Sequence, residues 1–199
     1  MSKTVLAAIP IKPFGVAKRR LADRLDGATR SRVGRCIAAR TATAAGDAGA
    51  LIAVVTGDTG VAAWARANGY LAIPETNAGG LDGAAEAVVA EAARCHRTWA
   101  VIHADLPLIT PAALAPVFEL ATSRSVLVPS HDGGTNVIAG SGTAFRFAYG
   151  RASFHRHLAA YPNSSVVTDV RLALDLDTGD DLTRVLAHPL GAWLAPLLG

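Results

Sequence analysis

The chain has 199 residues, of which 51% are hydrophobic, 18% are charged and 6% are aromatic, and its formal net charge is +3. This length corresponds to one domain, and the abundant apolar residues exclude an intrinsically disordered chain. Glycine, proline or a charge interrupts every apolar run before the ~20 residues of a membrane helix, so we expect a soluble protein without a membrane partner.

The first apolar run is predicted to be a strand rather than a signal peptide. Residues 4–9 are apolar, but Lys12 and Pro13 follow where the hydrophobic part of a signal peptide would continue. Cys36 and Cys95 show no CxxC spacing, so neither a disulfide framework nor a zinc site is predicted. Both observations favour a cytoplasmic location.

Apolar strands and helical segments alternate along the chain. Continuous apolar strands such as VLAAI and LIAVV are typical of a mainly parallel sheet with helices on both faces. The sequence therefore predicts one α/β domain over residues 1–199, with ligands at the carboxyl ends of the strands. The predicted strands are 4–9, 51–55, 70–73, 99–103, 125–129, 137–139 and 172–174; the predicted helices are 28–45, 59–67, 83–95, one beginning at Pro111 with Thr110 as its cap, and 153–160; residues 74–81 are predicted to be a loop.

A basic segment, IPIKPFGVAKRRL at residues 9–21, follows the first predicted strand. Residues 1–40 carry ten Lys or Arg and two Asp, a charge of +8, whereas the remaining chain carries −5. Lys12, Lys18 and Arg20 could neutralise a triphosphate there, although the segment is neither a Walker A loop nor a GxGxxG motif. A solvated basic turn explains the same residues equally well.

Carboxylates follow two other predicted strands. Asp105 in VIHADLP stands where an α/β enzyme would place a Mg²⁺ ligand, but a turn residue is at least as common there. His103 is more simply a half-buried histidine with satisfied hydrogen bonds. The predicted strand 172–174 leads into Asp175 and Asp177, which are two residues apart, so strand alternation would point both to the same face. If this strand lies beside the one that ends near Asp105, the three acids could form a metal site. Capping of the next helix is an equally good role for Asp177.

Two glycine-containing segments, SHDGGTN and YGRASF, could bind an anion. The hydroxyls of Thr135 and Ser153, together with backbone N–H groups near Gly150, are suitable donors. The alternative is two ordinary turns, with Ser153 as a helix cap. Neither a GxSxG nor an HExxH motif is present, so serine hydrolase and zincin chemistry lack their signatures.

Five segments taken together resemble one family in order and spacing: IPIKPFGVAKRRLA, ADLPLI, HDGGTN, YGRASFHRHLA and LALDLDTGDDL. Over residues 4–185 the chain is similar to the CofC/FbiD guanylyltransferases of deazaflavin coenzyme (F-420) biosynthesis. These enzymes are related to molybdenum-cofactor guanylyltransferases and share their GT-A-like, Rossmann-like nucleotidyltransferase fold. The resemblance implies transfer of GMP from GTP to phosphoenolpyruvate, 2-phospho-L-lactate or 3-phospho-D-glycerate, with release of pyrophosphate.

The resemblance also implies roles for individual residues. Asp82 stands in GLDGAA, at a position where the family would have an amide side chain. This departure leaves a contact between Asp82 and guanine open. A carboxylate can, however, accept hydrogen bonds from the N–H groups of guanine. The implied catalytic residues are Lys18 and Asp105; the nucleotide-binding residues Lys12, Lys18, Arg20, Gly80 and Asp82; the acceptor-binding residues Thr135, Gly150 and Ser153; and the Mg²⁺ ligands Asp105 and Asp175, with Asp177 as their neighbour.

Two other functions are compatible with parts of the sequence. Another GT-A nucleotidyltransferase, acting on molybdopterin or a sugar phosphate, would usually show a glycine-rich first loop. A nucleic-acid-binding domain could use the arginines at 30, 32, 35 and 40, but aromatic residues for base stacking are missing near them, and we expect no nucleic-acid partner.

The apolar C-terminal segment LGAWLAPLLG could dock on its own core or form a homodimer. The product would pass to the transferase that uses the deazaflavin precursor.

Overall fold

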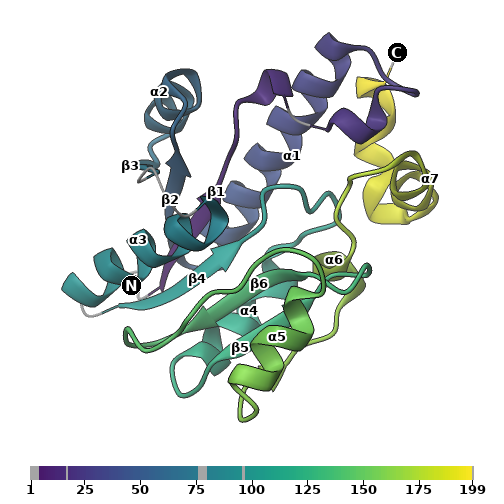
Figure 1. The fold of residues 1–199 in the computed structure, drawn as a ribbon. Helices are drawn as coiled ribbons and strands as arrows, with labels where there is room; N and C mark the ends of the chain where they lie inside the picture. The colour runs from purple at the N-terminus through teal and green to yellow at the C-terminus, as the bar shows by residue number, and fades with distance from the viewer. Residues whose placement is uncertain (1–4, 17, 76–79, 96, 199) are drawn as a thin grey trace.

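The structure of the chain is a computed structural model that describes residues 5–16, 18–75, 80–95 and 97–198. One seven-stranded sheet forms its centre (Figure 1). The strand order is β3-β2-β1-β4-β6-β5-β7. Neighbours among β3, β2, β1 and β4 pair in parallel, as do β5 and β7, whereas β6 is antiparallel to both β4 and β5. The strands are β1 (Val5–Pro10), β2 (Ala50–Thr56), β3 (Leu71–Pro74), β4 (Thr98–Ile102), β5 (Val126–Pro129), β6 (Thr135–Gly140) and β7 (Ser165–Val166).

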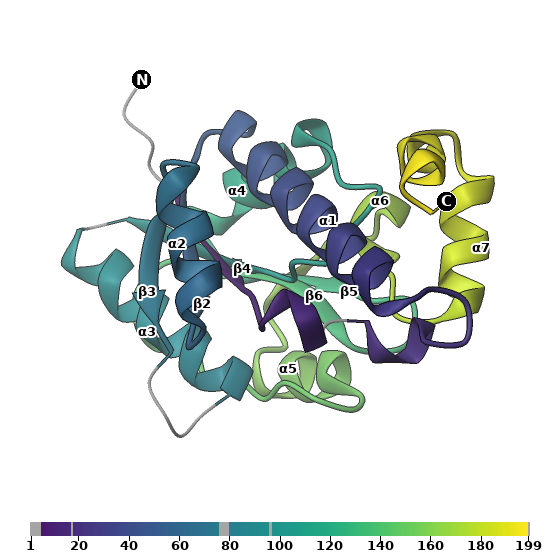
Figure 2. The same ribbon diagram turned by 90° about the horizontal axis from the view of Figure 1, so that it is seen from above.

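Helices cover both faces of this sheet (Figure 2). Side chains of β1 alternate between two cores: Ile9 packs with α1, α2 and α4, whereas Leu6 packs with α3 on the other face. The α-helices are α1 (Gly27–Asp47), α2 (Thr59–Ala67), α3 (Gly80–Arg94), α4 (Pro111–Ala121), α5 (Ser153–Ala160), α6 (Val170–Ala173) and α7 (Gly179–Ala187); the 3₁₀ helices are η1 (Phe14–Val16), η2 (Arg19–Leu21) and η3 (Pro189–Leu197). The predicted α/β architecture is therefore confirmed.

The start of α4 matches its sequence signals. Pro111 is in the first turn, and the side chain of Thr110 accepts a hydrogen bond from the N–H of Ala113. Of the predicted loop 74–81, residues 76–79 lie outside the described residues. Within the part of the chain that the structure describes, no helix combines the length and apolar character that a membrane span requires.

The predicted strand at residues 172–174 is wrong. A short helix, α6, occupies Val170–Ala173; Leu174 after it is extended, and residues 174–177 belong to no strand. The cause is local: the side chain of Asp169 accepts a hydrogen bond from the N–H of Arg171 and pairs with its guanidinium, which starts a helical turn. Asp175 and Asp177 therefore follow a helix, and strand alternation does not explain their positions.

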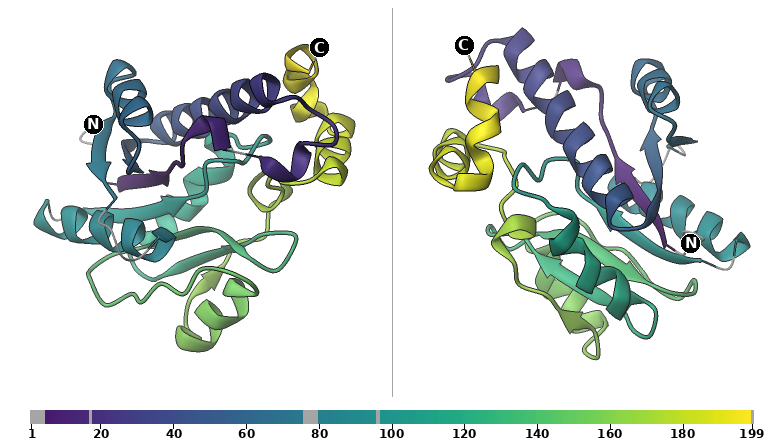
Figure 3. Two further views of the ribbon diagram at one scale, coloured as in Figure 1. Left: turned by 45° about the horizontal axis from the view of Figure 1, so that its top comes forward. Right: turned by 180° about the vertical axis from the view of Figure 1, so that it is seen from behind.

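The C-terminal segment docks on its own chain beside the start of α1 (Figure 3). Leu194 is buried in a third apolar cluster with Leu108 and Leu174. The indole N–H of Trp193 donates to the carbonyl of Pro107 at 3.1 Å, and Arg32 donates to the carbonyl of Leu197. The segment thus supports the loop that follows β4.

Candidate active site

A cavity of about 520 Å³ lies at the carboxyl ends of β1, β2 and β4, the edge predicted to bind ligands. Its wall includes residues from the basic segment after β1, from the loop after β4 and from the two glycine-containing segments. The predicted site residues in the wall are Lys12, Lys18, Asp105, Thr135, Gly150, Ser153, Asp175 and Asp177. Segments far apart in the sequence therefore meet at one cavity.

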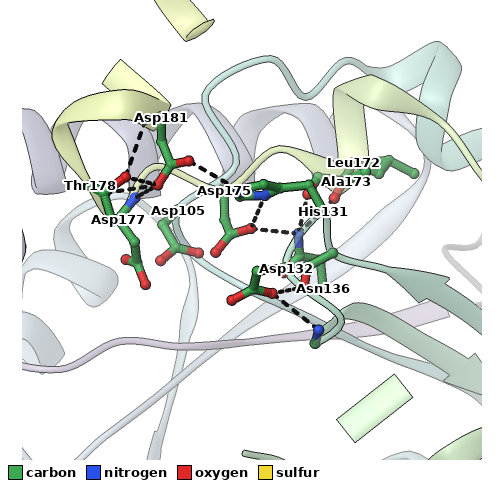
Figure 4. Close-up of polar contacts among 12 residues, drawn as sticks. Asp105, His131, Asp132, Asn136, Leu172, Ala173, Asp175, Asp177, Thr178 and Asp181 are labelled. Carbon is green, nitrogen blue, oxygen red and sulfur yellow. Dashed lines mark hydrogen bonds and ion pairs between the residues drawn. The ribbon is translucent and has the colours of Figure 1, made fainter. Parts of the chain in front are cut away.

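Three carboxylates converge in this wall (Figure 4). Asp105, Asp175 and Asp177 each offer one oxygen atom, and these atoms lie within 4.8 Å of one another. A backbone hydrogen bond from the N–H of Leu176 to the carbonyl of Asp105, at 3.0 Å, joins the two acidic segments. Among the described residues, Asp105 Oδ1 is buried without a hydrogen-bond partner. A cluster of hard oxygen ligands that retains an unused buried lone pair fits a divalent cation.

Lys18 is the cation that faces this cluster. Its Nζ lies 2.7 Å from Asp105 Oδ2 and 3.1 Å from Asp177 Oδ1, and its side chain is only 7% exposed. Burial alone would lower the pKa of Lys18, but Asp105 and Asp177 outweigh it and raise the pKa above its ordinary value. The φ of Lys18 is 57°, in the left-handed region that non-glycine residues seldom adopt. The ion pairs hold a charged lysine against the three carboxylates.

Residues in and around the acidic cluster shift the pKa values of Asp105 and Asp175. Burial opposes ionisation of Asp105, but its electrostatic interactions, first with Lys18 and then with His103, keep the pKa of this carboxyl below its usual value. Burial and the negative charge of Asp105 raise the pKa of Asp175. One lysine therefore leaves the cluster short of positive charge, and a bound cation would favour ionisation of Asp175.

Two side chains of the HDGGTN segment hold Asp175. The amide of Asn136 donates to the carbonyls of Leu172 and Ala173 and, at 3.3 Å, to Asp175 Oδ1. His131 lies between two acids: its Nδ1 is 3.3 Å from Asp175 Oδ1 and its Nε2 is 3.0 Å from Asp181 Oδ1 (Figure 4). This role of the segment was not predicted, because its glycines and hydroxyl residues indicate only donors to an anion.

His131 is braced by the start of α7. Asp181 forms a capping box with Thr178, accepting from its N–H and hydroxyl at 2.8 Å while the N–H of Asp181 bonds the Thr178 oxygen. Thr178 and Asp181 therefore cap this helix, and the side chain of Asp177 contacts Lys18 instead. The capping alternative for Asp177 is wrong.

We expect His131→Ala to weaken metal binding by roughly tenfold, because loss of a residue that orients a metal ligand typically costs 10- to 100-fold in affinity. Titration of Mn²⁺ by electron paramagnetic resonance, on the wild type and the variant, measures this change. His155→Ala, an exposed histidine on α5, is the control and should bind Mn²⁺ as the wild type does. Equal affinities for wild type and His131→Ala would contradict the assignment.

The predicted acceptor residues line the same cavity. Thr135, the first residue of β6, and Ser153, the first residue of α5, are 1% and 2% exposed, and their hydroxyl oxygens are 3.2 Å apart. Ser153 does not cap α5: the cap position is Ala152, which makes no side-chain cap bond. The φ of Gly150 is 110°, a conformation that favours glycine.

Three predicted nucleotide-binding residues are not brought to the cavity wall. Arg20 is exposed on η2, and Gly80 is exposed at the start of α3 with a φ of 53°. Asp82 accepts a hydrogen bond from the N–H of Tyr149 at 2.9 Å, so one of its oxygens is already used. Its contact with guanine, and the nucleotide roles of the other two residues, stay predictions.

His103 differs from its predicted role. It is half-buried, and its backbone N–H donates to the backbone carbonyl of Asn136 at 2.9 Å. Its Nε2, however, is buried without a partner among the described residues, and its ring centroid lies 5.5 Å from that of Tyr149. The expectation of a fully satisfied histidine is therefore wrong.

Comparison with known families decides among the alternatives. The family model described as guanylyl transferase CofC like matches residues 5–194. The chain belongs to this family. The CofC-like match spans β1 to η3 and so includes every residue of the acidic cluster and Lys18. The predicted resemblance is confirmed.

Individual CofC-like relatives differ in how much of the chain they match. A phosphoenolpyruvate guanylyltransferase of Streptomyces scabiei (strain 87.22) is 32% identical over 92% of this chain and 90% of its own length. A 2-phospho-L-lactate guanylyltransferase of Haloquadratum walsbyi (strain DSM 16790 / HBSQ001) is 40% identical, but over 48% of this chain and 32% of its own length. A structure assigned as a nucleotide-diphospho-sugar transferase from Desulfovibrio desulfuricans G20 shares the fold, with a TM-score of 0.75, 14% identity, and coverage of 98% and 95% of the two chains.

Proposed function

We propose that this protein transfers GMP from GTP to phosphoenolpyruvate and releases pyrophosphate, in deazaflavin coenzyme biosynthesis. The observation that carries the proposal is the convergence of Lys18 with three carboxylates in a cavity whose wall also includes Thr135 and Ser153, two hydroxyl residues that lie 3.2 Å apart. A phosphoryl-transfer enzyme needs these two features: charge neutralisation for a triphosphate and a separate anion site for the acceptor.

The reaction is a direct displacement. An oxygen of the acceptor phosphate forms a bond to the α-phosphorus of GTP, the bond from that phosphorus to the bridging oxygen breaks, and pyrophosphate leaves with the electron pair. The acceptor phosphate is already ionised at neutral pH, so no side chain has to remove a proton. The residues of the cavity act by positioning two anions that repel each other and by neutralising charge on the non-bridging oxygens.

Asp105, Asp175 and Asp177 would hold Mg²⁺, which when bound neutralises phosphate charge as a Lewis acid. Lys18 adds a positive charge beside the same carboxylates, and Lys12 lines the same cavity. We propose that both lysines bind the triphosphate and that Arg20, exposed on η2, adds positive charge near them. Gly80 and Asp82 belong to the proposed nucleotide side through the start of α3.

Phosphoenolpyruvate is the proposed acceptor because the relatives named for it match nearly the whole chain. Matches over 92% or more of this chain, to Streptomyces and Nocardia proteins, carry that name. The relatives named for 2-phospho-L-lactate match 45% to 48% of it. The acceptor pocket lies in the later half of the chain, at Thr135, Gly150 and Ser153, so relatives that align over the full length inform it better.

The test is incubation of the purified protein with GTP, Mg²⁺ and each of phosphoenolpyruvate, 2-phospho-L-lactate and 3-phospho-D-glycerate. Pyrophosphate release identifies the acceptor, and mass spectrometry of the product identifies the new diphosphate. We expect release with phosphoenolpyruvate to exceed release with the other two acids. Turnover only with a sugar phosphate or molybdopterin would overturn the proposal.

Ser153→Ala is expected to raise the KM for the phospho-acid about tenfold, because one hydrogen bond to a charged group is lost. The KM for GTP should stay within about twofold, since the hydroxyl of Ser153 bonds Thr135, whereas Lys18 bonds Asp105 and Asp177. Steady-state kinetics with each substrate varied in turn measures both values. Ser123→Ala, an exposed serine after α4, is the matched control. A raised KM for GTP alone would move Ser153 out of the acceptor pocket.

Four further expectations belong to this proposal. The single domain over residues 1–199 is supported by the one sheet that joins strands from Val5 to Val166. Homodimer formation, transfer of the product to the enzyme that uses the deazaflavin precursor, and the cytoplasmic location stay predictions.

A further inference from the structure

His157 lies one turn after Ser153 on α5, fully buried and outside the cavity wall. Both of its ring nitrogens are engaged. The N–H of Ala148 donates to Nε2 at 2.9 Å, and Nδ1 lies 3.0 Å from the hydroxyl oxygen of Thr135. A buried histidine whose two nitrogens meet different kinds of partner has a defined tautomer.

The backbone N–H decides which nitrogen carries the proton. Because Nε2 accepts from Ala148, it must present a lone pair, and the single proton of the neutral ring is on Nδ1. Burial, followed by the charge of Arg156, lowers the pKa of His157 to about 4 against the opposing effect of Asp82, so the ring is neutral at physiological pH. The tautomer is therefore set over the whole range in which the protein would work.

This tautomer dictates the direction of the hydroxyl hydrogen bonds. Nδ1–H donates to Thr135 Oγ1, so the hydrogen of the Thr135 hydroxyl must point elsewhere: to Ser153 Oγ, 3.2 Å away, or into the cavity. If Thr135 donates to Ser153, the hydrogen of Ser153 is the one that faces the cavity. In both cases the pair offers an O–H donor to a ligand, and a donor suits an anionic group.

We propose that His157 is a positioning residue that orients the Thr135–Ser153 hydroxyl pair as hydrogen-bond donors to an anionic group, phosphate or carboxylate, of the acceptor. The identity of that acceptor rests on the proposed function, whereas the direction of the hydrogen bonds rests on the ring and its neighbours.

The surroundings keep the ring in place. The ring centroids of Tyr149 and Phe145 lie 5.3 Å and 5.9 Å from that of His157. The backbone that bonds Nε2 is itself held from two sides, because Arg156 donates to the carbonyl of Ala148 at 2.8 Å and Asp82 accepts from the N–H of Tyr149. Asp82, the residue that replaces the expected amide, therefore also holds the backbone next to His157.

The first experiment measures the tautomer directly. In long-range ¹H–¹⁵N correlation spectra of the ¹⁵N-labelled protein, we expect His157 to carry its proton on Nδ1 at pH 7 and to remain neutral down to about pH 5. His157→Gln identifies the signals by their loss. A proton on Nε2, or a protonated ring at pH 7, would overturn the proposal whatever the substrate is.

The second experiment separates positioning from folding. His157→Leu removes both hydrogen bonds, whereas the side-chain amide introduced by His157→Gln can accept from Ala148 and donate to Thr135. We expect His157→Leu to raise the KM for phosphoenolpyruvate about tenfold with the KM for GTP unchanged, and His157→Gln to restore most of the loss. His155→Leu, exposed on the same helix, is the matched control. Equal defects in the Leu and Gln variants, or equal effects on both substrates, would contradict the proposal.

Failure of the proposed function would be distinguishable. If the wild type released no pyrophosphate with any of the three acids, the spectra would still report the tautomer. Calorimetric binding of inorganic phosphate to the wild type and His157→Leu would then measure anion recognition without turnover. About tenfold weaker binding to the variant supports the role of His157, and equal binding overturns it.

Discussion

Asp105→Asn is expected to lower the rate of pyrophosphate release by at least roughly 10³-fold while the protein stays folded. The amide keeps the shape of the side chain but removes the negative charge that attracts a cation and pairs with Lys18. It also relieves the repulsion that raises the pKa of Asp175, which partly offsets the stability lost with the Lys18 ion pair, so the variant should be less stable but still folded. Continuous measurement of pyrophosphate with GTP and phosphoenolpyruvate checks the rate, and thermal unfolding checks the fold.

Asp180→Asn is the control for this substitution. Asp180 is an exposed acid in the first turn of α7, close in sequence to the acidic cluster but outside the cavity wall. It should retain near wild-type activity. If Asp105→Asn also kept near wild-type pyrophosphate release, the assignment of Asp105 to a metal-assisted transfer would be wrong.

Lys18→Met is expected to reduce kcat by roughly 10²- to 10³-fold, the usual cost of removing one positioned donor that stabilises transition-state charge. Methionine fills a similar volume, so the loss should reflect charge rather than a cavity. Steady-state kinetics at saturating Mg²⁺ checks the value. Arg66→Met, which removes an exposed charge on α2, should leave kcat unchanged; a kcat within twofold of wild type in Lys18→Met would remove this lysine from the reaction.

The same variant should be less stable in a pH-dependent way. Lys18 helps to hold the pKa of Asp105 below its unfolded value, so this pairing contributes stability above about pH 4 and loses it as the pH falls through the lower folded value. The difference in unfolding free energy between wild type and Lys18→Met should therefore be larger at pH 7 than at pH 3. Urea unfolding at the two pH values measures it, and a difference independent of pH would contradict the pairing.

Local patterns predicted the elements well where the pattern and the environment agree. The apolar run at β1 is buried on both faces, and Thr110 and Pro111 begin α4 as their capping signals indicate. The resemblance placed Lys18 and Asp105 together although they are 87 positions apart, a distance over which composition and periodicity carry no information.

Other features depend on contacts that no local pattern contains. The segment before Asp175 forms a helical turn because the side chain of Asp169 accepts a hydrogen bond from the N–H of Arg171. The backbone bond from the N–H of Leu176 to the carbonyl of Asp105 nevertheless brings the two acidic segments together. The roles of His131 and Asn136 arise only after β6 and the segment after α6 come together. A histidine in a sequence indicates that its ring nitrogens form hydrogen bonds, but the sequence alone does not identify the partners.

The antiparallel placement of β6 next to β4 has an evolutionary consequence. Since Val137 pairs with Ile102, the beginning of β6 lies at the same edge as the end of β4, close to the segment that carries Asp105. On the proposed function, Asn136 belongs to the metal-binding residues because it bonds Asp175, whereas Gly150 and Ser153 belong to the acceptor residues. Substitutions at Gly150 and Ser153 would therefore change which small acid is accepted while Lys18 and the three carboxylates are inherited intact, so a new acceptor preference can arise from few substitutions.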